Sequence, residues 1–141
     1  MKTLRPLSIA LLLCSVSLCR TAHAVSADDQ AARAVAVRWL ALLDAGHYRQ
    51  AFEEMPPRMK AASLGVDHFV KACSAQRGAF GQAKSRTYYK ISAYKAANGW
   101  PDGNYQQIIF KSSFDHKAIG WEKVIMTKET GHWQVGNYFF K

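Results

Sequence analysis

The sequence has few cysteines, and most of them lie where they cannot crosslink a folded domain. Of three cysteines in 141 residues, Cys14 and Cys19 fall in an apolar stretch near the amino terminus that we interpret as removable. Cys73 would then remain alone, and no internal disulfide could form. The folded part must therefore be held together by its core.

Motifs for metal, phosphate and nucleophilic chemistry are also missing. None of the histidines beyond residue 24 stands at metal-ligand spacing. Gly78 and Gly81 follow a predicted helix and do not open one, so they indicate no phosphate-binding loop. There is no nucleophile-elbow motif, and Cys73 lies five residues from His68, a spacing that points the two side chains in different directions on a helix. We therefore predict no metal, no cofactor and no familiar nucleophile.

The first 24 residues have the pattern of a secretory signal peptide. Lys2 and Arg5 supply a positive start, and an uncharged run follows from Leu7 to Cys19. That run is shorter than the roughly 20 apolar residues that cross a bilayer. The segment Ala22-His23-Ala24 has the small residues that a signal peptidase accepts. We expect an exported protein, periplasmic or secreted, that is cleaved near Ala24.

Cleavage at that point would leave 117 of the 141 residues, which is one domain with its own core. Three of the nineteen basic residues and none of the ten acids would leave with the signal, so the remaining net charge would be +6. The lysines and arginines form no run, and export argues against a nucleic-acid partner. The net positive charge is compatible with an anionic envelope component or a small ligand as partner. It is also compatible with a charge that serves solubility alone.

The first half of the remaining chain has helical periodicity. Apolar residues centred on Trp39 recur at helical spacing after Ser26, which is a suitable N-cap. A second, short helix is predicted over 48–55, and Pro56-Pro57 is expected to end it. A third helix is predicted over about 66–79.

After Gln82 the composition changes to the β-branched and aromatic residues that are typical of strands. Turn residues such as Asn98-Gly99 and Thr130-Gly131 separate the predicted strands. Four strands are predicted, over about 86–94, 105–114, 119–128 and 133–140. Short links between them imply an antiparallel meander, and helices followed by strands imply the α+β class. The predicted fold is two to three N-terminal helices packed on a four-stranded antiparallel β-meander.

The predicted strands carry apolar residues on both faces. Ile108 and Phe110 point one way, while Tyr105 and Ile109 point the other. One face must pack on the helices, and the other has more apolar surface than a solvated face needs. That excess predicts a homodimer, a curled sheet or a pocket.

Several segments resemble the domain of unknown function 4019 family. Residues 36–40 (AVRWL) resemble its opening, and residues 101–105 (PDGNY) and 131–138 (GHWQVGNY) resemble its second half. Their order and spacing extend over nearly all of the chain beyond the signal. The resemblance implies a small exported bacterial protein with a cystatin-like or nuclear-transport-factor-two-like roll, and it implies no activity. Gly120 stands where the family pattern has a small residue such as alanine.

Charged residues occur where these patterns predict burial. Arg77 shares the apolar face of the third predicted helix, and Glu122 lies in a strand among apolar neighbours. We hypothesise that Arg77 or Arg86 pairs with Glu122 at the edge of a cavity between helices and sheet. Arg77, Arg86, Glu122 and Tyr89 form the candidate ligand or ion-pair cluster, and a purely structural ion pair is the alternative.

Three functions remain open from the sequence. A non-catalytic binding or interaction domain would use the cavity or the second sheet face. A structural or dimerising envelope domain would have a filled interior and an exposed apolar sheet face. A small isomerase-like or hydrolase-like enzyme would need a closed pocket in which Glu122 faces a tyrosine hydroxyl. We expect the first function, then the second, and place the enzyme last.

Overall fold

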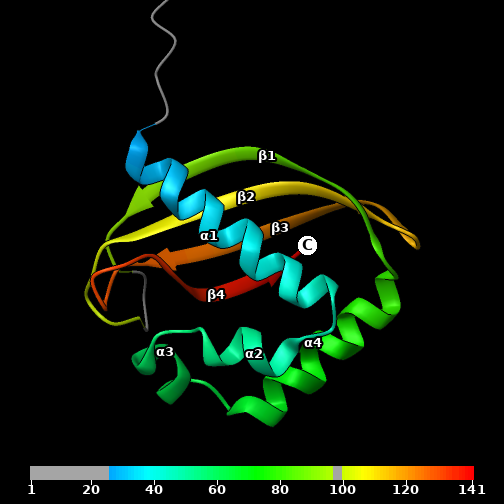
Figure 1. Ribbon diagram of the computed structural model, residues 1–141, viewed down its shortest axis with the longest axis horizontal. Coiled ribbons are helices and arrows are strands. Elements are labelled where there is room, and N and C mark those ends of the chain that lie inside the picture. The colour runs from blue at the N-terminus through cyan, green and yellow to red at the C-terminus, as the bar shows by residue number, and fades with distance from the viewer. Residues whose placement is uncertain (1–25, 97–99) are drawn as a thin grey trace, which may run out of the picture.

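The computed structural model describes residues 26–96 and 100–141, so the predicted signal peptide and the Asn98-Gly99 turn lie outside it. In these ranges four helices precede four strands (Figure 1). The helices are α1 (Ala27–Asp44), α2 (Tyr48–Glu53), α3 (Pro57–Ala61) and α4 (Val66–Phe80). The strands are β1 (Ala83–Tyr94), β2 (Tyr105–Phe114), β3 (Lys117–Thr127) and β4 (Gln134–Phe140).

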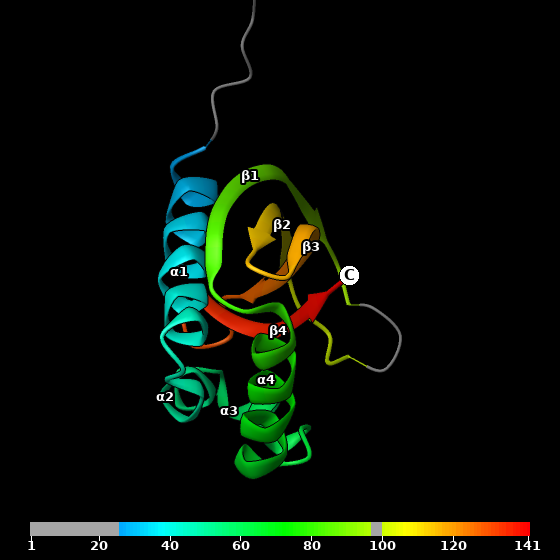
Figure 2. The same ribbon diagram turned by 90° about the vertical axis from the view of Figure 1, so that its right-hand side faces the viewer.

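The strands form one antiparallel sheet in the order β1-β2-β3-β4. The predicted α+β class and antiparallel meander are therefore confirmed. Strand β2 has the predicted bounds, whereas β1 begins three residues before the predicted Arg86. Helix α1 crosses one side of the sheet, and the opposite side faces away from it (Figure 2). We call that opposite side the outer face.

Helix α1 begins and packs as its sequence predicts. The Ser26 hydroxyl accepts a hydrogen bond from the Asp29 amide at 3.0 Å, which satisfies a free donor of the first turn. Trp39, only 1% exposed, lies in the core and donates from Nε1 to the Ala51 carbonyl at 2.8 Å. This bond joins α1 to α2 and satisfies a polar group that burial would otherwise leave without a partner.

The Pro56-Pro57 pair does more than end a helix, which corrects the sequence prediction. Helix α2 ends at Glu53, Pro56 is extended, and Pro57 is the first residue of α3. Proline suits that position, because its fixed φ fits a helix and its missing amide would have had no partner there. Met59 of α3 then joins Phe52 in a small second cluster beside the core.

The space between α1 and the sheet is filled by side chains. The large apolar residues buried there come from α1, β2, β3 and β4, and they include Trp39, Leu40, Leu43, Ile108, Phe110, Val124, Met126 and Val135. The cavity that the sequence analysis placed between helices and sheet is occupied by this core.

A packed aromatic ring accounts for the glycine at position 120. A Cβ on Gly120 would lie 2.1 Å from Cζ of Phe140, whose ring is held against Phe80 at a centroid distance of 4.3 Å. We expect Gly120→Ala to lower the free energy of unfolding by about 1–3 kcal/mol, measured by urea denaturation. Gly136→Ala is the control, because its Cβ would meet no atom closer than 3.5 Å. Equal urea midpoints for Gly120→Ala and the wild type would contradict the close packing.

Candidate functional site

The carboxylate of Glu122 on β3 is fully buried within a polar cluster. The side chain is 0% exposed and faces α1 and α4. Its Oε1 accepts hydrogen bonds from Arg77 Nη2 and from the Tyr138 hydroxyl, both at 2.9 Å. Its Oε2 accepts from Arg86 Nε at 2.6 Å and from the Ser112 hydroxyl. Both carboxylate oxygens are therefore satisfied by protein groups.

Asp44, at the end of α1, completes the charge balance of this cluster. It accepts from Arg86 Nη1 at 2.8 Å and from Arg86 Nη2 at 3.2 Å, a two-pronged contact. Arg77 Nη2 also lies 3.3 Å from Asp44 Oδ1. Two arginines and two carboxylates thus form a neutral square that joins α1, α4, β1 and β3. We call Asp44, Arg77, Arg86, Glu122 and Tyr138 the buried charge cluster.

Arg77 is buried with fewer hydrogen bonds than its guanidinium could make. Its Nε and Nη1 have no hydrogen-bond partner among residues 26–96 and 100–141. The rings of Phe114 and Tyr138 lie 5.0 and 5.7 Å from its Cζ instead. Such cation–π contacts compensate part of the lost hydration.

Three of the four candidate residues proposed from the sequence meet, and one does not. Both Arg77 and Arg86 contact Glu122. Tyr89 is 60% exposed and lies on the outer face, where its ring packs edge-on against Trp121 at 5.0 Å. The inclusion of Tyr89 in the cluster was therefore wrong, and Tyr138 supplies the tyrosine hydroxyl.

A β-bulge explains the position of Tyr89. The pairing of β1 with β2 passes from Tyr88 opposite Phe110 to Lys90 opposite Ile109, so Tyr89 is an extra residue. A bulge shifts the alternation of a strand by one residue. Tyr88 therefore packs on the core side, while Tyr89 and Lys90 both belong to the outer face. Simple alternation would have turned Lys90 inward.

The electrostatics of the cluster keep Glu122 ionised. Burial acts to raise the pKa of Glu122, but the hydrogen bond and charge of Arg86, helped by Ser112 and Arg77, hold that pKa below its ordinary value. Burial and the charge of Glu122 raise the pKa of Tyr138, so its hydroxyl stays protonated. A buried carboxylate with a lowered pKa is a weak base and has no open contact for a substrate.

The outer face has a repeating pattern of lysines and apolar side chains. One row across the four strands contains Lys90, Ile109, Lys123 and Phe139. The next row contains Thr87, Lys111, Trp121 and Lys141. Adjacent positions in these rows thus alternate between a lysine and an uncharged residue, and neither row has an acid. With Tyr89, we call these two rows the lysine–aromatic face.

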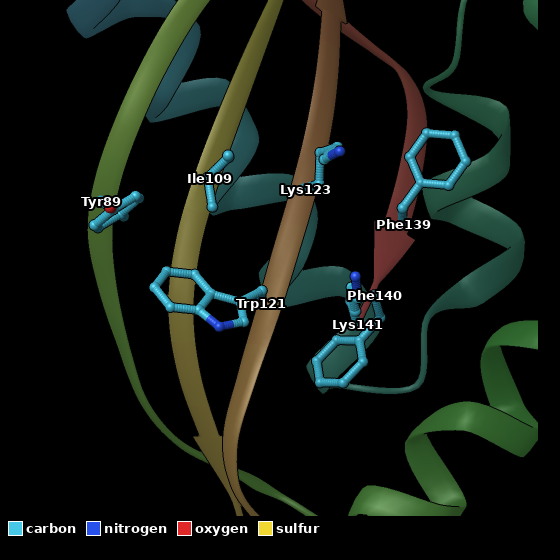
Figure 3. Close-up of a pocket in the computed structure, with 7 residues that line it drawn as sticks. All are labelled: Tyr89, Ile109, Trp121, Lys123, Phe139, Phe140 and Lys141. Carbon is cyan, nitrogen blue, oxygen red and sulfur yellow. The ribbon is translucent and has the colours of Figure 1, made fainter.

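A groove of about 510 Å³ lies in the lysine–aromatic face (Figure 3). Its lining residues are Tyr89, Ile109, Trp121, Lys123, Phe139, Phe140 and Lys141. Tyr89, Ile109 and Trp121 lie side by side on the face turned away from α1, with Lys123 between Ile109 and Phe139 (Figure 3). Ligand pockets commonly have volumes of this order and a mostly apolar lining.

The positive charge of this face is not neutralised within the protein. None of the four lysines takes part in an ion pair with any residue that the structure describes. The arginines of the buried charge cluster, in contrast, are both paired with carboxylates. The lysine–aromatic face is therefore free to attract a negatively charged group.

Other kinds of site find little support in the described ranges. No group of three or more His, Cys, Asp and Glu residues there could hold a metal ion. Helices long and apolar enough to cross a membrane are also absent from these ranges. Burial raises the pKa of the Cys73 thiol to about 11, so the thiol is protonated and unreactive at neutral pH.

A comparison with curated proteins gives no match. A family model described as a protein of unknown function, DUF4019, matches residues 35–138. The matched range includes every residue of the buried charge cluster and also Tyr89, Ile109 and Trp121 of the groove. The resemblance read from the sequence is therefore confirmed, and the chain belongs to the DUF4019 family.

Proposed function

We propose that this protein is an exported, non-catalytic binding domain and that the lysine–aromatic face is its binding surface. One observation carries the proposal: the domain fills its interior yet leaves Tyr89, Trp121 and Phe139 around an open groove on the far side of the sheet. Apolar side chains gathered in this way on a folded domain mark interaction sites. The signal-like first 24 residues support export.

The buried charge cluster supports a structural role for Glu122 and not a catalytic one. An enzyme that used Glu122 as a base would need an open pocket beside the carboxylate. Here Arg77, Arg86, Ser112 and Tyr138 fill the hydrogen-bonding positions of the carboxylate, which is fully buried. The low pKa of Glu122 weakens it further as a base.

The charge of the lysine–aromatic face argues against a dimer that forms through it. A two-fold dimer apposes the same surface of both copies. The lysines of both copies would then be brought into one interface, and neither row offers an acidic side chain to pair with them. A partner of opposite charge fits this face better than a second copy.

An uncharged fluorescent probe tests whether the groove binds apolar molecules at all. We expect N-phenyl-1-naphthylamine to bind the mature protein with a rise in fluorescence. Trp121→Ala should weaken that binding about fivefold or more, because the substitution removes the largest apolar side chain of the groove. Leu64→Ala is the matched control, since Leu64 is 79% exposed and lies outside the groove.

Two results would contradict the proposed function. The first is equal probe binding by the wild type and Trp121→Ala. The second is a stable dimer by light scattering that excludes the probe, because the face would then be an interface between copies.

A further inference from the structure

The chemistry of the groove indicates which class of ligand it takes. We propose that the groove binds an anionic amphiphile: a single alkyl or acyl chain with one negatively charged head group. This inference rests on the proposed function, because it assigns the ligand class for the same surface.

The apolar part of the ligand would lie on the floor of the groove. Ile109 and Trp121 are half-buried there, and Phe139 stands at one side with 48% of its surface exposed. Contact with an alkyl or acyl chain would remove apolar surface of both partners from water. That burial stabilises the complex by about 25 cal/mol for each Å². The groove volume of about 510 Å³ suits one chain-like molecule.

The charged part of the ligand would be held by lysines. Lys123 lies between Ile109 and Phe139 in its row, and Lys141 is paired with Trp121 in the next. Both lysines line the groove, so a head group could meet an ammonium group whichever way the ligand lies on the floor. None of the lining residues has an acidic side chain, so no side-chain carboxylate of the groove competes for these ammonium groups.

Two other anionic partners fit the surface less well. A nucleobase needs a flat ring that is open for stacking. The ring of Trp121 is instead met by Tyr89 at an interplanar angle of 70°. A bilayer surface favours apolar side chains that project and insert, whereas Trp121 and Ile109 form the bottom of a hollow.

The test compares three twelve-carbon ligands that differ in head-group charge. Laurate, dodecanol and dodecyltrimethylammonium, each below its micelle concentration, would displace N-phenyl-1-naphthylamine from the mature protein. We expect laurate to displace the probe at the lowest concentration and the cation at the highest. Added salt should weaken the binding of laurate but not that of uncharged dodecanol.

A lysine substitution locates the head group. Lys123→Gln should weaken laurate about fivefold and leave dodecanol unchanged, because one exposed ion pair contributes on the order of 1 kcal/mol. Lys71→Gln removes the same charge from an exposed position on α4 and should change neither ligand.

The outcomes separate this inference from the proposed function. Equal displacement by laurate and dodecanol would overturn the anionic ligand while leaving the apolar binding surface intact. If the probe itself did not bind, both the proposed function and the anionic ligand would be contradicted. Binding to phosphatidylglycerol vesicles or to a single-stranded oligonucleotide, with no binding of monomeric laurate, would overturn the inference in favour of a membrane or a nucleic acid.

Discussion

Glu122→Gln should lower the free energy of unfolding by about 3–5 kcal/mol, the usual cost of breaking a buried ion pair by removing one partner. The substitution keeps the shape of the side chain but removes its negative charge. Arg77 and Arg86 would then share only Asp44, and a net positive charge would remain in the interior. Urea denaturation followed by tryptophan fluorescence measures this loss.

Glu54→Gln provides a matched control for that experiment. Glu54 pairs with Arg38 at 3.2 Å, but the Arg38 side chain is 67% exposed. Exposed pairs contribute about 1 kcal/mol or less, so the control should stay close to the wild type. Equal losses at the two positions would show that burial of Glu122 has no special cost.

The same residue predicts how stability depends on pH. The pKa of Glu122 in the folded protein lies below its ordinary value of 4.5. Its stabilising contribution is therefore complete above about pH 5 and is lost as the pH falls through the folded pKa. The stability gap between wild type and Glu122→Gln should be constant near neutrality and shrink below pH 4.5. A gap that stayed unchanged into the acid range would contradict the lowered pKa.

Trp39→Ala should lower the free energy of unfolding by about 3–5 kcal/mol, because it empties the centre of the core. The ring packs against Phe69 and Tyr138 at centroid distances of 6.2 and 5.8 Å. Its loss would also leave the Ala51 carbonyl without its hydrogen bond. The measurement is again a urea transition, here followed by far-ultraviolet circular dichroism.

Trp121→Ala is the matched control, because it makes the same substitution on the outer face. We expect a loss of about 1 kcal/mol or less there. If the two tryptophan variants unfolded at the same urea concentration, the core would not lie between α1 and the sheet. The same control shows that the loss of probe binding in Trp121→Ala is not caused by unfolding.

Local periodicity was enough to predict the fold class and three of the five residues of the buried charge cluster, Arg77, Arg86 and Glu122. Helix α1 and strand β2 follow patterns that repeat within a few residues, so the start of α1 and both ends of β2 could be predicted directly. Arg77 and Glu122 could be found because each is a charge in an apolar pattern. Asp44 could not be predicted as a member of the cluster. Its contact partner Arg86 is 42 residues away in the sequence, and no local pattern indicates that contact.

The apolar excess of the second sheet face was predicted, but the lysines of the lysine–aromatic face were missed for a related reason. Its lysines are far apart in the chain and form no run, which favoured mere solubility. They come together only when β1, β2, β3 and the end of β4 align in register. The misplacement of Tyr89 has another origin, since a one-residue bulge is not visible in a pattern of period two.

The bulge at Tyr89 has a consequence for how this strand can vary in length. Before it, β1 directs Arg86 inward to the carboxylates, and after it the strand directs Lys90 outward. The two halves of β1 therefore run out of phase, and that offset places Arg86 and Lys90, four residues apart, on opposite faces. Losing the extra residue would remove the bulge and leave them three positions apart, and plain alternation would still direct the arginine inward and the lysine outward. The strand can therefore shorten by one residue at this point while both charges keep their surfaces.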